Sequence, residues 1–176
     1  MIRRSDGAYD WWFELTPDPN RHHAGNRGAL ARLRRCSSVA EAMQEPATMS
    51  LFQRCEATHP GDLPAIGLAA AVLAHVRRDQ PGMPVARLIG PDSPDKPETA
   101  LMKPLRFRRL LEAGEPDECL IVFRRLVALA GGEVQVRDLS RALLDWTNPY
   151  RQDEAKRRWV FAYWNANPMK AEETAA

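Results

Sequence analysis

The sequence predicts an all-α protein, built as a compact multi-helix bundle. Apolar residues recur at helical spacing through most of the 176 residues. No stretch alternates apolar and polar residues over a useful length, and neither an Asn-Gly hairpin turn nor an internal repeat occurs. A hydrophobic content of 44% can form a sizeable core, in one domain or in two small helical lobes.

The first half of the chain predicts an opening pair of helices. A helix carrying Trp11 and Trp12 should stop before Pro17, because proline cannot continue a helix interior. After Asn26, a second helix is expected over 27–35, and it carries a cluster of basic residues.

Two brief helices and one core helix should follow. Ser38 can cap a short helix that Pro46 ends, and Ser50 can cap another that ends near Pro60. The run 65–76 is apolar on most sides, which is typical of a helix at the centre of a domain.

The second half begins with a proline-rich connection and two helices. Within 82–100 only 85–89 can form a short helical piece, and 101–132 is divided into two helices by Gly114 and Pro116. An amphipathic helix over 134–146 and a final helix over 152–165 complete the bundle. The expected organisation is an amino-terminal lobe, a connecting loop, a carboxy-terminal lobe and a frayed tail, at 1–81, 82–100, 101–167 and 168–176.

Arginine dominates the positive charge of the chain. The formal net charge is only +2, but 21 of the 25 basic residues are arginine. The stretch 103–111 holds four positive charges and no acid. Arginine presents a planar, permanently charged fork that suits phosphate groups. A GC-rich genome that favours arginine codons would explain the excess equally well.

Residues for phosphate contact are chosen from these basic clusters. On the first helix of 101–132, Arg106, Arg108 and Arg109 share one arc of the helical wheel, with apolar residues opposite. On the second, two arginines form the one charged gap in an otherwise apolar surface. The candidate nucleic-acid-binding residues are Arg34, Arg35, Arg106, Arg108, Arg109, Arg124, Arg125, Lys156, Arg157 and Arg158, with Arg27, Arg77, Arg78 and Arg151 as second choices.

Ordinary structural roles compete with these assignments. Each basic residue could equally be a solvated cation or one member of a helical salt bridge. For Arg125, an internal ion pair such as one with Asp145 is favoured over a phosphate contact. The five tryptophans lie at helical spacing among Leu and Ala, so we expect core packing rather than a platform for stacking bases.

Catalytic and metal sites are not predicted. Cys55 and His59 form the one potential ligand pair at helical spacing, and two ligands do not make a zinc site. Phosphate-binding loops, nucleophile elbows and catalytic triads have no match in the sequence. No cofactor is expected.

The cellular compartment is predicted from cysteines and hydropathy. Three widely spaced cysteines indicate free thiols in a reducing cytoplasm. The start lacks the features of a secretory signal, and the longest apolar run, 65–76, is too short to cross a bilayer. We therefore expect no membrane association.

Several blocks of the sequence carry a family resemblance. These are the amino-terminal Trp, GNRGALARLRR, MKPLRFRRLLEAG, IVFRRLVALAGG and LLDW…KRRWVFAYW. Their order and spacing resemble the small subunit of the type I-E CRISPR Cascade complex, the CasB family, over roughly 9–165. Asn26 stands where an acidic residue would be expected.

The resemblance implies an all-helical, non-catalytic subunit that occurs as a pair inside the complex. It implies packing against the Cascade backbone subunits and the large subunit. It also implies contacts with crRNA and with opened target DNA, above all the displaced non-target strand. Sequence choice would then be made by guide pairing, and this subunit would contact the sugar-phosphate backbone.

Two other functional classes stay open from the residues alone. The segment VQVRDLSRALLDW could belong to a helix-turn-helix of a stand-alone transcription regulator, which would prefer one duplex sequence. An enzyme of unrecognised type has only scattered polar residues in its favour.

Overall fold

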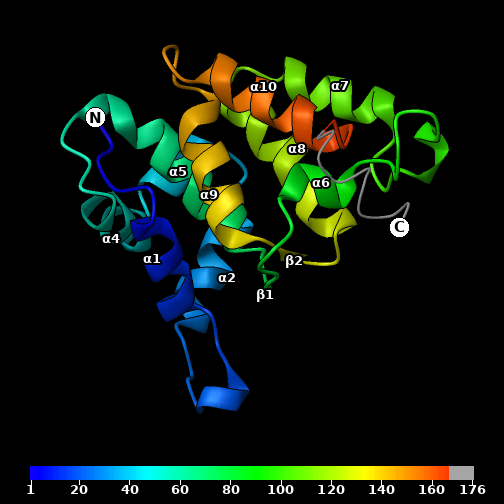
Figure 1. The fold of residues 1–176 in the computed structure, drawn as a ribbon. Helices are drawn as coiled ribbons and strands as arrows, with labels where there is room; N and C mark the ends of the chain where they lie inside the picture. Colours follow the sequence, from blue (N-terminus) through cyan, green and yellow to red (C-terminus); the bar gives the residue numbers. More distant parts are fainter. Residues whose placement is uncertain (167–176) are drawn as a thin grey trace.

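The computed structural model describes residues 1–166, and within them the fold is all-α, as the sequence predicts (Figure 1). Short 3₁₀ turns connect some of the helices. The helices are α1 (Gly7–Leu15), α2 (Arg27–Arg35), α3 (Val39–Met43), α4 (Pro46–Arg54), α5 (Leu63–Leu73), α6 (Val85–Ile89), α7 (Pro104–Glu112), α8 (Pro116–Leu129), α9 (Val136–Trp146) and α10 (Gln152–Tyr163).

Capping chemistry explains several helix starts. The Asn26 side chain accepts a hydrogen bond from the backbone N–H of Ala29 at 3.0 Å, so it caps α2. Ser38 accepts from the backbone N–H of Glu41 at 3.2 Å and caps α3, as predicted. The predicted bounds of α2 and of the short α6 are confirmed.

The predicted bounds of α4 are wrong. Pro46 begins this helix instead of ending the preceding one, and Ser50 lies inside it rather than at its cap. The reason is that the first residue of a helix donates no intrahelical hydrogen bond, so proline loses nothing there and its fixed φ favours the helix. A proline between two short helical patterns is therefore ambiguous from sequence.

The structure contains a small sheet that the sequence does not predict. Residues β1 (Arg78–Asp79) and β2 (Glu133–Val134) pair in parallel, with Arg78 opposite Glu133. The Asp79 carboxylate also accepts a hydrogen bond from the backbone N–H of Val136 at 2.8 Å, at the start of α9. Two-residue strands are too short to leave a period-two pattern, but this pair joins the two halves of the chain.

The core is centred on α5, as predicted. Its residues from Ala65 to Leu73 are buried, and α5 contacts α3 and α4 from the first half as well as α8 and α9 from the second. The buried residues form a single hydrophobic cluster. The lobe boundary at 82–100 stays a prediction, although the core is continuous across it, and the predicted tail at 168–176 lies outside the described residues.

Aromatic rings form the part of the core beneath α8. Phe123 packs edge-on against Trp146 and Trp159, with centroid distances of 5.0 and 5.6 Å. On α7, Phe107 stacks on Tyr163 of α10 at 3.8 Å, which fixes α7 against α10. The prediction that tryptophans are core residues is confirmed for all but the half-buried Trp164, with Trp11, Trp12, Trp146 and Trp159 at most 5% exposed.

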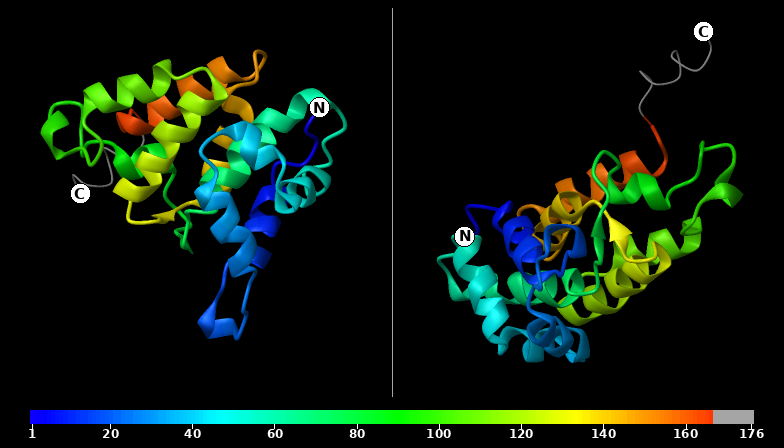
Figure 2. Two further views of the ribbon diagram at one scale, coloured as in Figure 1. Left: turned by 180° about the vertical axis from the view of Figure 1, so that it is seen from behind. Right: turned by 90° about the horizontal axis from the view of Figure 1, so that it is seen from below.

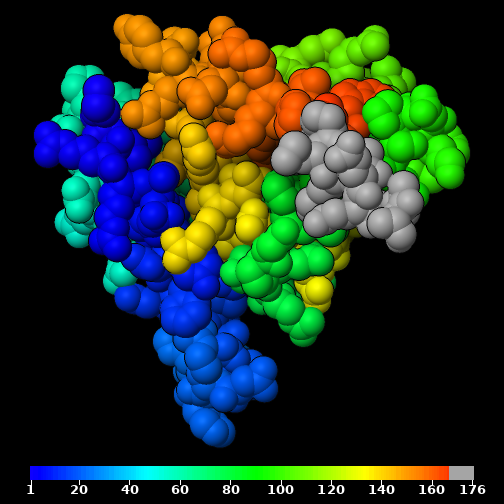
Figure 3. Space-filling model, viewed as in Figure 1, coloured from blue at the N-terminus to red at the C-terminus, as the bar shows by residue number. Residues whose placement is uncertain are grey.

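The connection between α1 and α2 projects from the body of the molecule (Figure 3). It is held by backbone hydrogen bonds between Asp18 and His23 and by Arg21, which stacks over Phe13.

Among the described helices, none has the length and apolar character needed to cross a membrane.

The aromatic cluster gives a stability prediction. Replacing Phe123 by Ala should lower the free energy of unfolding by about 3 to 5 kcal/mol, since a fully buried ring is lost and a cavity is left. Phe161→Ala is the matched control, because that ring is 53% exposed on α10 and its loss should cost far less. Chemical denaturation measures both; equal losses would show that Phe123 is not a core anchor.

Candidate nucleic-acid interface

The basic face predicted for α7 exists. Arg106, Arg108 and Arg109 are exposed, while Phe107 and Leu110 are buried on the opposite side. Because Phe107 is stacked on α10, the helix cannot roll without losing that contact, and its arginines stay directed outward. Within the described residues, none of the three arginines forms an ion pair or a side-chain hydrogen bond.

On α8, the adjacent residues Arg124 and Arg125 have opposite environments. Arg124 is half-buried and its guanidinium donates to the carbonyl oxygens of Cys36 at 2.7 Å and Leu33 at 3.0 Å, at the end of α2. A weaker bond of 3.5 Å reaches the carbonyl of Ala71 on α5. Burial lowers the pKa of Arg124 from its ordinary value. Arg124 therefore ties three helices together, and it positions the interface more than it offers a charge.

Arg125 is exposed and lacks an ion-pair partner among residues 1–166. The suggested pair with Asp145 is wrong. The Asp145 carboxylate instead meets Arg151 at 3.4 Å and Arg141 at 4.0 Å. Consecutive helical residues point about 100° apart, so placing Arg124 against α2 turns Arg125 toward solvent.

A cavity of about 670 Å³ lies between α7 and α8, and we refer to it as the α7–α8 cavity. Three predicted arginines meet there, and none of the described acidic side chains lines it. Its lining residues are Met102, Arg106, Arg109, Leu110, Val122, Arg125, Ala128 and Leu129.

A second cavity, of about 340 Å³, adjoins the first at Ala128. We call it the α8–β2 cavity after the turn between those two elements, whose Gly131 and Gly132 line it. Its lining also contains no acidic side chain from the described part of the chain. Seen from behind, α8 crosses the molecule between α7 and α2 (Figure 2). The first cavity is lined by the face of α8 that carries Arg125, the second by the neighbouring face that carries Arg124, and the two meet at Ala128. The lining residues of the second are Arg34, His75, Arg77, Arg124, Val127, Ala128, Gly131 and Gly132.

Backbone contacts hold the arginines of the α8–β2 cavity. Arg34 donates through Nε to the carbonyl of Ala74 at 2.6 Å, and Arg77 donates through Nη2 to that of Gly131 at 2.9 Å. Gly132 has φ of +77°, which other residues rarely adopt, and a Cβ there would approach Arg77 Nε to 2.9 Å, so a substitution would strain the turn and displace Arg77. Two of the predicted arginines are thus fixed while most of each guanidinium fork stays available.

We call the two adjoining cavities the arginine groove. It contains six of the predicted candidates, which are Arg34, Arg77, Arg106, Arg109, Arg124 and Arg125. Arg108 is exposed beside it on α7.

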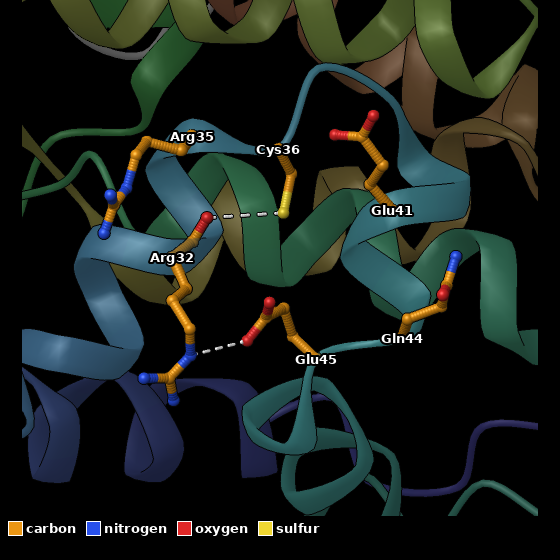
Figure 4. Close-up of a pocket in the computed structure, with 6 residues that line it drawn as sticks. All are labelled: Arg32, Arg35, Cys36, Glu41, Gln44 and Glu45. Atoms are coloured by element: carbon orange, nitrogen blue, oxygen red, sulfur yellow. Dashed lines mark hydrogen bonds and ion pairs between the residues drawn. The ribbon is translucent and has the colours of Figure 1, made fainter.

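Other candidates lie outside the groove. Arg35 borders a different cavity of about 370 Å³, shown in Figure 4. There Arg32 and Glu45 point toward each other with a 2.9 Å contact, and Glu41 adds a second carboxylate. Mixed charge of this kind does not favour a phosphate group.

Ion pairs engage two of the second-choice residues. Arg78 meets Glu133 across the small sheet at 3.1 Å, and Arg151 meets Asp145. Arg27 is exposed at the start of α2 and lines neither cavity of the groove.

On α10 the basic residues point in different directions. The Lys156 ammonium lies 5.8 Å from the ring of Trp146, and the Arg158 Nη2 atom is buried without a partner among the described residues. Arg157 is exposed beside an apolar surface of α10. These three residues therefore do not extend the arginine groove.

Sequence reasoning missed the apolar part of the groove. Met102, Val122 and Leu129 line the α7–α8 cavity. In the sequence, Met102 only precedes α7, and the other two resemble ordinary core residues of α8. A signal existed on α8, where Val122 and Leu129 lie seven residues apart and share a side with Arg125. Nothing in the sequence showed that α7 would meet that side.

The fold and the groove together define an all-α protein with an arginine-lined surface between α7, α8 and α2. A model of the family described as CRISPR-associated protein Cse2 matches residues 29–164. The chain belongs to this Cse2 (CasB) family, and the prediction of a CasB-family Cascade subunit is confirmed.

Solved structures agree with this assignment. The chain is similar to TTHB189, a CRISPR-associated protein of the Cse2 family from Thermus thermophilus, and to CasB from the same organism. Each comparison gives 25% identity and a TM-score of 0.64, and covers 92% of this chain and 97% of the other. No curated protein sequence matches the chain.

The α8–β2 cavity gives a prediction for acid stability. Burial lowers the pKa of His75 from 6.5 to about 4, and the guanidinium groups of Arg124 and Arg34 act in the same direction. Below pH 6.5 His75 binds a proton in the unfolded chain but not in the folded chain. The free energy of unfolding should therefore fall as the pH drops from 6.5 to 4. One proton contributes at most about 1.4 kcal/mol per pH unit.

Denaturation at a series of pH values tests this prediction. His75→Gln should flatten the loss of stability between pH 6.5 and 4, whereas His22→Gln, at an exposed turn, should leave the profile unchanged. Identical profiles for the His75 variant and the parent would contradict a neutral, half-buried His75.

Proposed function

We propose that the chain is a non-catalytic small subunit of a type I-E Cascade ribonucleoprotein that holds nucleic acid by its sugar-phosphate backbone. In this role it contacts crRNA and target DNA, above all the displaced non-target strand, and stabilises the opened duplex. Its partners are the Cascade backbone and large subunits and a second copy of itself, in the cytoplasm. Family membership supports the assembly role.

One observation carries the nucleic-acid part of the proposal. Arg106, Arg109 and Arg125 converge on the α7–α8 cavity, and none is paired with a carboxylate within residues 1–166. Water solvates a single exposed arginine well, so the informative feature is that three of them meet at one cavity whose lining has no acidic side chain from the described residues. Three guanidinium groups left together provide a field that attracts phosphate.

Such contacts suit a subunit that does not choose the sequence. Phosphate contacts position a strand without reading its bases, and guide pairing supplies the specificity. They release counterions, so the affinity should fall steeply with salt.

The structure speaks against α9 as the recognition helix of a stand-alone regulator. Val136, Leu139 and Leu143 are buried, and Trp146 lies inside the aromatic cluster. On its outer face, Arg137 is paired with Asp6 at 2.9 Å. To read a base, Arg137 would have to leave both Asp6 and the ring of Tyr9, over which its guanidinium lies at 4.1 Å.

Charge reversal at Arg106, Arg108 and Arg109 tests the proposal. The assembled complex should bind target DNA more weakly, and the slope of log affinity against log salt should fall by roughly 2, because three phosphate contacts to a single strand are lost. The fold should survive, since all three side chains are exposed. Filter binding or fluorescence anisotropy at several salt concentrations measures both quantities.

A matched control reverses the same number of charges elsewhere. Arg3, Arg27 and Lys96 are exposed, lie outside the groove and form no ion pair among residues 1–166, so their reversal should leave the slope nearly unchanged. The proposal is wrong if both triple variants behave alike, or if the α7 variant keeps its affinity and its slope.

A further inference from the structure

The α7–α8 cavity contains more than phosphate binding needs. Four of the apolar lining residues are buried or half-buried and form its floor, whereas its three arginines are exposed at its edge. The floor residues are Met102, Leu110, Val122 and Leu129. A phosphate backbone contact requires cations and gains nothing from an apolar floor. The neighbouring α8–β2 cavity differs, because arginines, a histidine and glycine backbone make up most of its lining.

We propose that the α7–α8 cavity takes an unpaired nucleobase from a single strand, with the phosphates on either side of that base held by Arg106, Arg109 and Arg125. This inference rests on the proposed function and specifies the form of nucleic acid that the groove binds. The strand continues past Ala128 into the α8–β2 cavity, where the lining suits phosphate groups.

The size and chemistry of the cavity fit a base. Its volume of about 670 Å³ is larger than one base and leaves room for the attached sugar and the flanking phosphates. Guanidinium planes stack on the faces of bases, and an apolar floor covers the ring from water. Both contacts act on the face of the ring, which every base possesses, so the cavity accepts any base.

The same features exclude a duplex. In a double helix each base is paired and stacked between neighbours, so its ring cannot enter a cavity between two helices without being flipped out. The groove therefore binds single strands in preference to duplexes of equal charge. That preference is what the holder of a displaced strand requires.

An acidic amphipathic helix of a partner protein is the competing occupant. It would also satisfy three cations and an apolar floor. The second cavity favours nucleic acid, because Arg34 and Arg77 in its lining continue the positive charge beyond Ala128. A single strand carries a phosphate on both sides of each base, so it can place a base on the apolar floor and a phosphate against the arginines of the second cavity.

The test compares two strands that differ only in their bases. Fluorescently labelled oligothymidylate and a fully abasic strand of the same length and phosphate count are titrated with the purified full chain at low salt. We expect the abasic strand to bind about tenfold more weakly or worse, because base stacking is lost while every phosphate remains. A thymidine–adenosine duplex of that length should also bind more weakly than the single strand.

A pair of neighbouring substitutions locates the effect. Val122→Asn places an amide on the floor of the cavity and should remove most of the difference between the two strands. Ile121→Asn makes the same chemical change one residue away, at a side chain that is 51% exposed and outside the cavity, and should preserve the difference. Circular dichroism melts confirm that both variants fold.

The outcomes separate this inference from the proposed function. If the parent binds both strands equally while reversal of Arg106 and Arg109 weakens both, the groove holds phosphates and the base-binding inference is overturned. If Val122→Asn leaves strand binding intact but impairs incorporation into the complex, the occupant is a protein helix and the inference is overturned as well. If arginine reversal weakens neither strand, the proposed function itself fails.

Discussion

The burial of Phe123 against Trp146 and Trp159 is the contact on which the rest of the arrangement depends. It fixes the rotation of α8 about its own axis, because the ring has no alternative place once the two indoles have closed around it. With that rotation set, Arg124 must lie against the end of α2 and Arg125 must face outward. The direction of the charges is therefore a consequence of apolar packing.

The other helix of the groove is positioned in the same way. Phe107 stacks on Tyr163, and the Tyr163 hydroxyl donates to the carbonyl of Met102 at 2.7 Å, just before α7 begins. These contacts hold α7 beside α10 and leave its arginines toward solvent. Burial of apolar side chains in the core stabilises both helices. The exposed arginines therefore keep their positions without stabilising contacts of their own.

Most of the helices and the basic face of α7 could be predicted from the sequence, because a helix and its buried face depend on the local spacing of apolar residues. The amphipathic pattern of α7 located its basic face correctly, and the all-apolar run of α5 identified the central helix. The start of α4 was misplaced because a proline can either end a helix or begin one. The β1–β2 pair was missed because residues distant in sequence meet over only two positions.

The partners of charged side chains could not be predicted by the same reasoning. Two adjacent arginines on an apolar helix look alike in sequence, and only the packing of α8 against α2 distinguishes Arg124 from Arg125. The apolar floor of the α7–α8 cavity is also a property of two helices together, since Val122 and Leu129 face outward from one and are enclosed by the other. Long-range packing decides which of the many arginines remain available.

The most direct measurement of this account compares Arg124→Met with Arg125→Met, using denaturation and single-strand binding on the same two proteins. Methionine keeps most of the side-chain length and removes the charge. The Arg124 variant should lose on the order of 2 kcal/mol of unfolding free energy, because buried carbonyls at the end of α2 lose a charged donor. The Arg125 variant should keep its stability within about 0.5 kcal/mol and bind the strand more weakly. If the two variants instead lose stability and affinity to the same extent, packing of α8 does not divide the roles of these neighbours, and the account is contradicted.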